Sequence, residues 1–228
     1  MKKAFVTGIT KGIGKAIALA LLQAGYEVSG CARQGTAFQA FQTENPNCIL
    51  YPVDLADSSA RQKFCTSLKE LPAFDIWINN VGIFFSGEFW KESATDFGKQ
   101  WQLNVVTPYE LTQAVLPAMI TRKQGTILNI VSIAAREILP NCVGYTTTKF
   151  ALDGFTRSLR EELRPHQIRV IGVYPASTQT ESWGDSSFPN GRLLNPNEIA
   201  KMIVSALSLP EYAVTEEIQI RSIFGNLP

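Results

Sequence analysis

Short apolar runs rich in β-branched residues alternate along the chain with longer stretches in which apolar residues recur at helical spacing. The seven short runs are AFVTG (4–8), YEVSGCA (26–32), CILYPVD (48–54), FDIWINN (74–80), GTILNIVS (125–132), IRVIGVYP (168–175) and EIQIRSI (217–223). Such runs predict buried strands, and the helical stretches between them predict crossovers. The pattern therefore predicts an α/β fold, a doubly wound Rossmann-type parallel sheet of seven strands with helices on both faces.

A single domain, residues 1–228, accounts for this pattern, because no linker, repeat or low-complexity segment divides it. The least patterned stretch is STQTESWGDSSFPNGRLLNPNE at 177–198, which is polar and predicts a loop. Pro196 marks the start of the next helix, since proline suits the first helical position. A loop of this kind suits a substrate lid, which we place around residues 182–194.

The charge balance limits what the protein can attract at long range. The 228 residues are 45% hydrophobic and 18% charged, and 21 basic against 20 acidic residues give a formal net charge of +1. This balance produces no field for general attraction to nucleic acid or to membrane surfaces. We therefore expect a small-molecule partner, and neither nucleic acid nor a membrane.

Cysteine and histidine usage argues against a metal centre. The chain has one histidine, His166, and its four cysteines form no CxxC pair: Cys31, Cys48, Cys65 and Cys142. We expect no metal site, and free thiols in a reducing cytoplasm. The first residues imitate a secretion signal, but Lys11 and Lys15 interrupt the apolar stretch that such a signal needs, which also favours a cytoplasmic protein.

The first predicted strand ends in VTGITKGIG, which places three glycines at a strand-to-helix turn. Glycines let the backbone approach a phosphate, and the helix N-terminus directs free amides and the positive end of its dipole at the same group. A tight turn alone would also use glycines, but the position after the first strand favours a nucleotide site. The predicted contact comprises Gly8, Thr10, Lys11, Gly12, Ile13 and Gly14.

A second motif, VGYTTTKFALDGF at 143–155, sets Tyr145 and Lys149 four residues apart in a helix-like pattern. Positions i and i+4 share a helix face, so the phenol and the ammonium can occupy one small volume. A tyrosine packed on a lysine stem would have the same spacing. Because a nearby cation favours the phenolate, we expect Lys149 to lower the pKa of Tyr145 from its reference value near ~10 and make it an acid–base catalyst.

Together and in order, the motifs resemble those of the short-chain dehydrogenase/reductase family, from Lys3 to about Ile223. The matching segments are TGITKGIG, VDL with Asp54, NNVG from Asn79 to Gly82, LNV with Asn104, NIVS with Ser132, Tyr145 with Lys149, and PASTQT from Pro175 to Thr180. Val81 and Ala176 depart from the family pattern, which has alanine and glycine there, and both bear on details of cofactor contact.

The resemblance implies the catalytic roles. Tyr145 would be the general acid in carbonyl reduction and the base in the reverse direction, and Lys149 would also bind the nicotinamide ribose. Ser132 would donate a hydrogen bond to the substrate oxygen, and Asn104 would support a proton relay through water.

The end of the second predicted strand favours NADP(H) over NAD(H). Family members that prefer NAD usually carry an acidic residue there, whereas this chain has Ala32 followed by Arg33, whose guanidinium suits the 2′-phosphate of NADP. Lys11 could add a second positive charge. Beyond the glycine turn, the implied cofactor contacts are Arg33, Asp54, Leu55, Asn80, Gly82, Tyr145, Lys149, Pro175, Ala176, Thr178 and Thr180.

Aromatic residues near the NNVG turn and in the proposed lid predict an apolar wall for the substrate. They are Phe84, Phe85, Trp183 and Phe188, and they could equally belong to the core. We assign Ser132, Phe84 and Trp183 to the substrate site. His166, at a helix exit, is expected to be structural.

The resemblance implies an NADP-dependent oxidoreductase that interconverts a carbonyl and an alcohol on a small, largely apolar molecule. It also favours a homodimer or homotetramer assembled through the helix bearing Tyr145. One alternative is a 3-oxoacyl-carrier-protein reductase, with a basic docking patch formed by Arg122 and Lys123, or by Arg157, Arg160 and Arg164. Another is a redox sensor that binds the cofactor without turnover, although such members generally lose the tyrosine and lysine.

Overall fold

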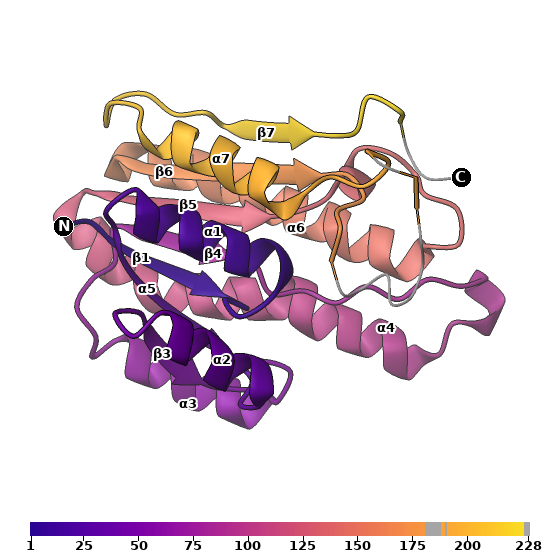
Figure 1. The fold of residues 1–228 in the computed structure, drawn as a ribbon, viewed down its shortest axis with the longest axis horizontal. Helices are drawn as coiled ribbons and strands as arrows, with labels where there is room; N and C mark the ends of the chain where they lie inside the picture. The colour runs from indigo at the N-terminus through magenta and orange to yellow at the C-terminus, as the bar shows by residue number, and fades with distance from the viewer. Residues whose placement is uncertain (181–187, 190, 226–228) are drawn as a thin grey trace.

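The computed structural model describes residues 1–180, 188–189 and 191–225, and it shows a parallel sheet between two layers of helices (Figure 1). The strands are β1 (Lys3–Thr7), β2 (Glu27–Ala32), β3 (Ile49–Pro52), β4 (Ile76–Asn79), β5 (Gly125–Ile130), β6 (Ile168–Pro175) and β7 (Glu217–Ile220). Their order is β3-β2-β1-β4-β5-β6-β7, and all neighbours are parallel. The predicted single domain with a doubly wound, seven-stranded sheet is confirmed.

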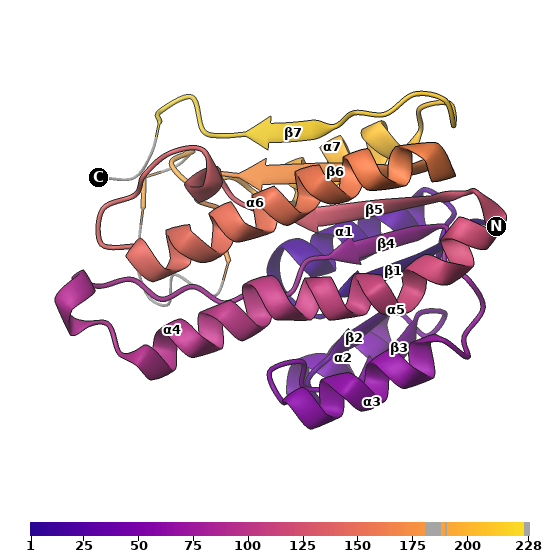
Figure 2. The same cartoon turned by 180° about the vertical axis from the view of Figure 1, so that it is seen from behind.

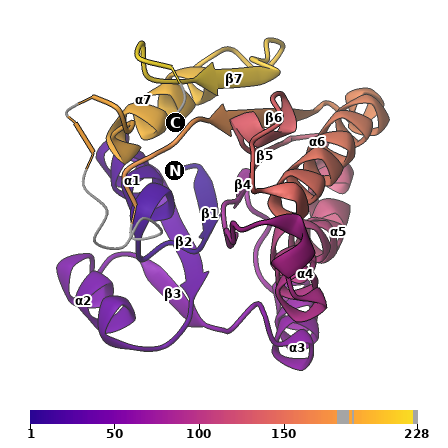
Figure 3. The same ribbon diagram turned by 90° about the vertical axis from the view of Figure 1, so that its right-hand side faces the viewer.

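Helices cover both faces of the sheet (Figures 2 and 3). One face is covered by α1 (Gly12–Gln23), α2 (Thr36–Glu44) and α7 (Pro196–Leu207), and the other by α3 (Ser58–Leu68), α5 (Thr107–Arg122) and α6 (Val143–Leu163). Alternate strand residues serve the two cores: Val6 and Ile78 pack on the α1 side, whereas Phe5 and Trp77 pack on the α5 side. This alternation follows from the period of two along a strand.

Side-chain caps fix the start of two of these helices. Asp57 accepts hydrogen bonds from the Ser59 and Ala60 amides at the start of α3. At α7, Asn195 and Glu198 form a capping box, and Pro196 is the first helical residue, as predicted.

A buried polar chain ties α5 and α6 to the middle of the sheet. Asn79 Nδ2 donates to Thr112 Oγ1 at 2.9 Å and to Asn129 Oδ1 at 2.8 Å, and Asn129 Nδ2 donates to Thr156 Oγ1 at 2.9 Å. Because all four side chains are buried, these bonds fix the register of both helices on the sheet.

One long helical rod lies along the α5 face. It consists of α4 (Ala94–Trp101), a π-helical turn η2 (Gln102–Val106) and α5, without a break. Short π segments interrupt α-helices mostly at functional positions, and Asn104 lies in the middle of this one.

Several predicted strands extend further than the observed ones. The run 217–223 ends as a strand at Ile220, the last residue in register with β6, where it pairs with Pro175. The run 74–80 begins as a strand at Ile76, paired with Ala4. Of the helices that the structure describes, none has both the length and the hydropathy required to cross a bilayer.

Candidate active site

The sheet changes its winding direction between β1 and β4, which are neighbours although the chain passes through β2 and β3 between them. In doubly wound sheets, ligands bind at this point, outside the carboxyl ends of the strands. The glycine turn follows β1, the NNVG turn follows β4, Ser132 follows β5, and the PASTQT run follows from β6. The fold therefore gathers at one edge motifs that are far apart in the sequence.

The glycine turn has the conformation that a phosphate site needs. Gly8 and Gly12 have φ values of +69° and +50°, which L side chains rarely adopt. A Cβ at Gly14 would clash with the Gly8 carbonyl oxygen, so α1 approaches the turn closely. The N-cap residue of α1, Lys11, makes no side-chain capping hydrogen bond, which leaves the first amides of the helix available to an anion. This cradle fits the pyrophosphate of a dinucleotide.

The NNVG turn is fastened to the end of β1. The amides of Asn80 and Val81 both donate to Thr7 Oγ1 at 2.9 Å, and Asn80 Nδ2 donates to the Thr7 carbonyl at 2.7 Å. Sequence reasoning passed over Thr7, although it opens the TGITKGIG motif. Its hydroxyl sets the position of the NNVG turn relative to the glycine turn.

Asn104 links the segment after β4 to the helix that bears Tyr145. Its Oδ1 accepts from the Ile83 amide at 2.8 Å, and its Nδ2 donates to the Ile83 carbonyl at 2.9 Å and to Thr148 Oγ1 at 3.0 Å. Thr148 in turn donates to the Tyr145 carbonyl at 2.7 Å. These bonds give the Asn104 amide a structural task, and its part in a proton relay stays a prediction.

Ser132, Tyr145 and Lys149 meet where η3 (Ile133–Ala135) faces the start of α6. Ser132 Oγ accepts from the Ala134 amide at 3.1 Å, and the Ser132 hydroxyl favours the phenolate of the neighbouring Tyr145. Lys149 is only 5% exposed, and its Nζ donates to the Ile130 carbonyl at 3.1 Å. The same Nζ lies 5.6 Å from the centroid of the Tyr145 ring. The structure thus brings the three predicted residues together.

Desolvation dominates the titration of this site. Burial raises the pKa of Tyr145 to about 12, opposed by the Ser132 hydrogen bond. Burial lowers the pKa of Lys149 from 10.5 to about 8. The pKa of Tyr145 is therefore raised where a lowered value was expected, because loss of water penalises the phenolate more than the groups around it support it. The phenol stays in its proton-donating form.

The predicted adenosine contacts lie further along the same edge. Arg33 directly follows β2 and is exposed, and Asp54 follows the neighbouring β3. Asp54 Oδ1 accepts from the Ala56 amide at 3.0 Å, which shapes the turn. Leu55 is buried, and its carbonyl accepts from Arg61 Nη1 at 2.8 Å.

The PASTQT run crosses the edge toward the glycine turn. The Ala176 amide donates to the Ile220 carbonyl at 2.9 Å, and Thr178 forms a bridge with Leu194. A Cβ at Gly12 would lie 3.2 Å from the Thr180 methyl carbon, so Thr180 faces the predicted phosphate cradle. Residues 181–187 and 190 lie outside the described residues, so most of the proposed lid and Trp183 do as well.

The structure brings one predicted wall residue into contact with Tyr145. The Phe84 ring meets the Tyr145 ring edge-on, with 4.8 Å between centroids. Phe85 is held through its backbone amide, which donates to Gln100 Oε1 at 3.1 Å. Contact of Phe84 with a substrate stays a prediction.

Two supporting residues escaped the sequence reasoning. Thr148 belongs to a run of three threonines, and the sequence does not indicate which of their side chains points into the protein. Arg61 is almost fully buried on α3, and it donates to the Leu55 carbonyl and, at 3.0 Å, to Gln102 Oε1. It therefore joins the adenosine side of the edge to the π-helical turn that carries Asn104.

Among the other titratable groups, Cys142 at the N-cap of α6 also raises the pKa of Tyr145. All four cysteines are free thiols, and the described part of the chain holds no cluster of three or more histidine, cysteine or acidic side chains that would suit a metal ion. His166 ends η4 (Arg164–His166) at the exit of α6, at the opposite end of that helix from Tyr145.

Known proteins share this arrangement. The family model described as short chain dehydrogenase matches residues 2–188. The chain is 31% identical over 218 residues to L-xylulose reductase of Mesocricetus auratus (95% of this chain, 85% of the relative). It is also 31% identical over 236 residues to a 3-oxoacyl-[acyl-carrier-protein] reductase of Aquifex aeolicus (96% and 95%). The crystal structure of a metagenomic short-chain oxidoreductase in complex with NADP is 30% identical, with a TM-score of 0.83 and 97% of each chain covered.

The family match extends from the first strand past Thr180, so it includes every motif that the fold gathers at the carboxyl edge. The two named reductases differ in the substrates that their names give, yet both match most of the chain, so these matches indicate the family rather than one substrate. On these grounds the chain belongs to the short-chain dehydrogenase family of oxidoreductases.

Proposed function

We propose that the protein is an NADP(H)-dependent oxidoreductase that interconverts a carbonyl and an alcohol on a small, largely apolar molecule. The observation that carries the proposal is the position of the Tyr145 phenol, beside Ser132 and the buried ammonium of Lys149. The edge-on contact of Phe84 with Tyr145 supports an apolar substrate.

Proton transfer in the direction of reduction would run from Tyr145 to the carbonyl oxygen. Because burial keeps the pKa of Tyr145 high, the phenol holds its proton until a substrate oxygen gains negative charge. Ser132 Oγ already accepts from the Ala134 amide, and its own hydrogen would turn to that same substrate oxygen. Lys149, with a pKa of about 8, is mostly cationic at neutral pH and would support the phenolate that remains.

The cofactor would lie along the carboxyl edge, and its reduced nicotinamide would supply the hydride. The glycine turn would hold the pyrophosphate, Asp54 and Leu55 the adenine, and Asn80 with Gly82 the middle of the molecule. Lys149 would bind the nicotinamide ribose. Near the nicotinamide we place Pro175, Ala176, Thr178 and Thr180.

NADP(H) is favoured over NAD(H) by the end of β2. Ala32 puts no carboxylate there to repel a 2′-phosphate, and Arg33 is exposed at the same edge as the glycine turn. Lys11 at the start of α1 would add to the positive charge. The NADP complex of the metagenomic relative agrees with this preference.

The carrier-protein alternative finds less support, because the arginines required for docking are engaged elsewhere. Arg160 is buried and donates to the Val170 and Glu216 carbonyls. Arg122 pairs with Asp75 at 3.1 Å. A carrier would have to break these contacts before it could use either arginine.

We place the subunit contact on the outer face of α5 and α6, in a homodimer or homotetramer. Val143 and Phe150 on α6 and Tyr109 on α5 are large apolar side chains that remain exposed in the single chain. Burying them against a second copy would remove apolar area from water.

The test is NADPH oxidation with a panel of aldehydes and ketones, which is measured as the loss of the near-ultraviolet absorbance of NADPH. Tyr145→Phe should lower kcat by orders of magnitude and leave the Kd for NADPH nearly unchanged, since only the hydroxyl is lost. Tyr212→Phe, on an exposed tyrosine outside the proposed site and the proposed subunit contact, is the matched control and should keep full activity. Binding of NADPH without turnover across the whole panel would instead identify a redox sensor, and near-wild-type turnover by Tyr145→Phe would refute the mechanism.

A further inference from the structure

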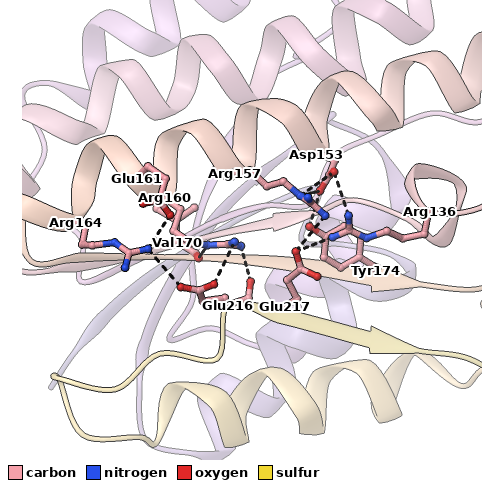
Figure 4. A network of polar contacts seen from close by, with 10 residues as sticks. All are labelled: Arg136, Asp153, Arg157, Arg160, Glu161, Arg164, Val170, Tyr174, Glu216 and Glu217. Carbon is pink, nitrogen blue, oxygen red and sulfur yellow. Dashed lines mark hydrogen bonds and ion pairs between the residues drawn. The ribbon is translucent and has the colours of Figure 1, made fainter.

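Three segments that carry proposed site residues also carry one polar cluster on the α6 side of the sheet (Figure 4). Arg136 lies four residues after Ser132, Asp153 lies four residues after Lys149, and Tyr174 directly precedes Pro175. We call Arg136, Asp153 and Tyr174, together with Glu217 of β7, the Arg136 cluster.

The guanidinium of Arg136 is held on several sides. Its Nη1 lies 3.3 Å from Asp153 Oδ2, and its Nη2 lies 2.7 Å from Glu217 Oε1. Its plane lies over the Tyr174 ring, with Cζ 4.1 Å from the centroid. The Tyr174 hydroxyl donates to Asp153 Oδ1 at 2.6 Å, and burial together with this bond raises the pKa of Tyr174, so the phenol remains a donor.

Packing around Tyr174 joins the same segments. Tyr174 is fully buried and packs with Val131, Ala135 and Leu152, which lie next to Ser132, Arg136 and Asp153 respectively. On the same strand, a Cβ at Gly172 would overlap the Tyr174 hydroxyl, so this glycine makes room for the ring to reach Asp153.

The turn between Ser132 and Arg136 is too short to absorb a shift at one end. Ser132 and Arg136 are the two caps of the three-residue η3. The Ala135 amide donates to the Ser132 carbonyl at 3.1 Å, and the Arg136 amide donates to the Ile133 carbonyl at 2.8 Å. Holding Arg136 against α6 and β6 therefore also holds Ser132 against Tyr145.

We propose that Arg136 is a positioning residue that fixes the Ser132 hydroxyl relative to Tyr145 by binding the η3 turn to α6 and β6. The inference rests on the proposed function for its catalytic consequence. Arg136 itself would touch neither substrate nor cofactor.

The chain offers a matched control in Arg157. This arginine binds the same two carboxylates, with Nε 3.1 Å from Asp153 Oδ2 and Nη2 3.4 Å from Glu217 Oε1. It lies on α6 and its side chain is 50% exposed, against 19% for Arg136. Arg157→Met therefore removes the same charge from the same pair of carboxylates without loosening η3.

The experiment is a double-mutant cycle on the full chain, with kcat and KM measured for both substrates. Arg136→Met should lower kcat by roughly tenfold to hundredfold, with the KM for NADPH within about twofold of wild type. In a Ser132→Ala background the same change should matter by less than about twofold, because the group it positions is gone. Arg157→Met should stay within about twofold in both backgrounds.

An equal loss in both backgrounds, or an equal loss from Arg157→Met, would overturn the proposal. If Arg136→Met does not fold, Tyr174→Phe removes only the hydroxyl bonded to Asp153 and should show a smaller loss of kcat that likewise depends on Ser132.

Hydrogen exchange separates this inference from the proposed function, since it needs no turnover. Amides of residues 131–137 should exchange faster in Arg136→Met than in Arg157→Met. Equal exchange in the two variants would refute the positioning role even if no carbonyl substrate is found.

Discussion

Lys149→Met removes an ammonium group that the fold buries beside the Tyr145 ring and the Ile130 carbonyl. Methionine is similar in length and apolar, so it can fill the same space. The variant lacks the hydrogen bond to Ile130 at every pH, so this loss does not vary with pH. It also lacks the amine, whose titration affects stability only in the range of its folded and unfolded pKa values. The pH dependence of stability therefore isolates the cost of burying the charge.

The size of this effect follows from the two pKa values of the lysine. Burial lowers the pKa from 10.5 to about 8, a difference that corresponds to about 3.4 kcal/mol when folded and unfolded chains are both protonated. Between these values the unfolded chain holds a proton that the folded chain has released, so the free energy of unfolding rises with pH. The penalty is nearly complete at about pH 7 and falls to about 1.4 kcal/mol at about pH 9.5. The wild type should therefore gain about 2 kcal/mol relative to Lys149→Met over this interval.

Urea unfolding of the cofactor-free protein, followed by circular dichroism at these two pH values, measures the difference. Other groups that titrate in this interval do so in both proteins, so their contributions cancel in the difference between the two free energies of unfolding. Lys201→Met, on the exposed side of α7, is the matched control and should show no pH-dependent difference. A gap between wild type and Lys149→Met that stays constant within about 0.5 kcal/mol, against the about 2 kcal/mol expected, would refute the reasoning.

Three further outcomes are expected. Arg33→Ile should lower the ratio of kcat/KM with NADPH to that with NADH by roughly tenfold to hundredfold, because one charged hydrogen bond to the 2′-phosphate is lost; a wild type that uses NADH at least as well as NADPH would contradict the assignment. Gly14→Ala should cost about 1–3 kcal/mol in urea unfolding because its Cβ would clash with the Gly8 carbonyl, whereas Gly154→Ala, with open space around it on α6, should gain up to about 1 kcal/mol. NADPH with an inhibitor should slow proteolysis within residues 182–194 if that segment is a lid, and equal cleavage with and without ligand would count against one.

Local patterns made the glycine turn and the Tyr145–Lys149 pair predictable from the sequence. The glycine spacing has meaning within one strand-to-helix turn, and the tyrosine and lysine share one helix face. The seven strands were visible for the same reason, since each is a short run whose apolar character does not depend on its neighbours. Their ends were less predictable, because the last paired residue, such as Ile220, is set by the partner strand.

Residues whose partners are distant in sequence could not be predicted in this way. Arg136 gains its meaning from Asp153, 17 residues on, and Asp153 from Tyr174, a further 21. The predicted direction of the pKa shift at Tyr145 was wrong for a related reason. Spacing brought the lysine near, but the depth of burial, which no spacing specifies, decided the outcome.

The π-helical turn at Gln102–Val106 sets the rotational phase of the rod to which it belongs. Such a turn takes up about one residue more than an α turn, so side chains beyond it are rotated by about 100° from where an unbroken helix would point them. As a result α5 directs Leu111 and Met119 into the core, while α4 directs the buried Gln100 at the amide of Phe85. One continuous rod thus packs α5 against the core and places α4 against the segment that contains Phe85. Removal of a single residue from the turn would turn the rod into one continuous α-helix. The rod would remain helical, but the Asn104 side chain would turn away from Thr148.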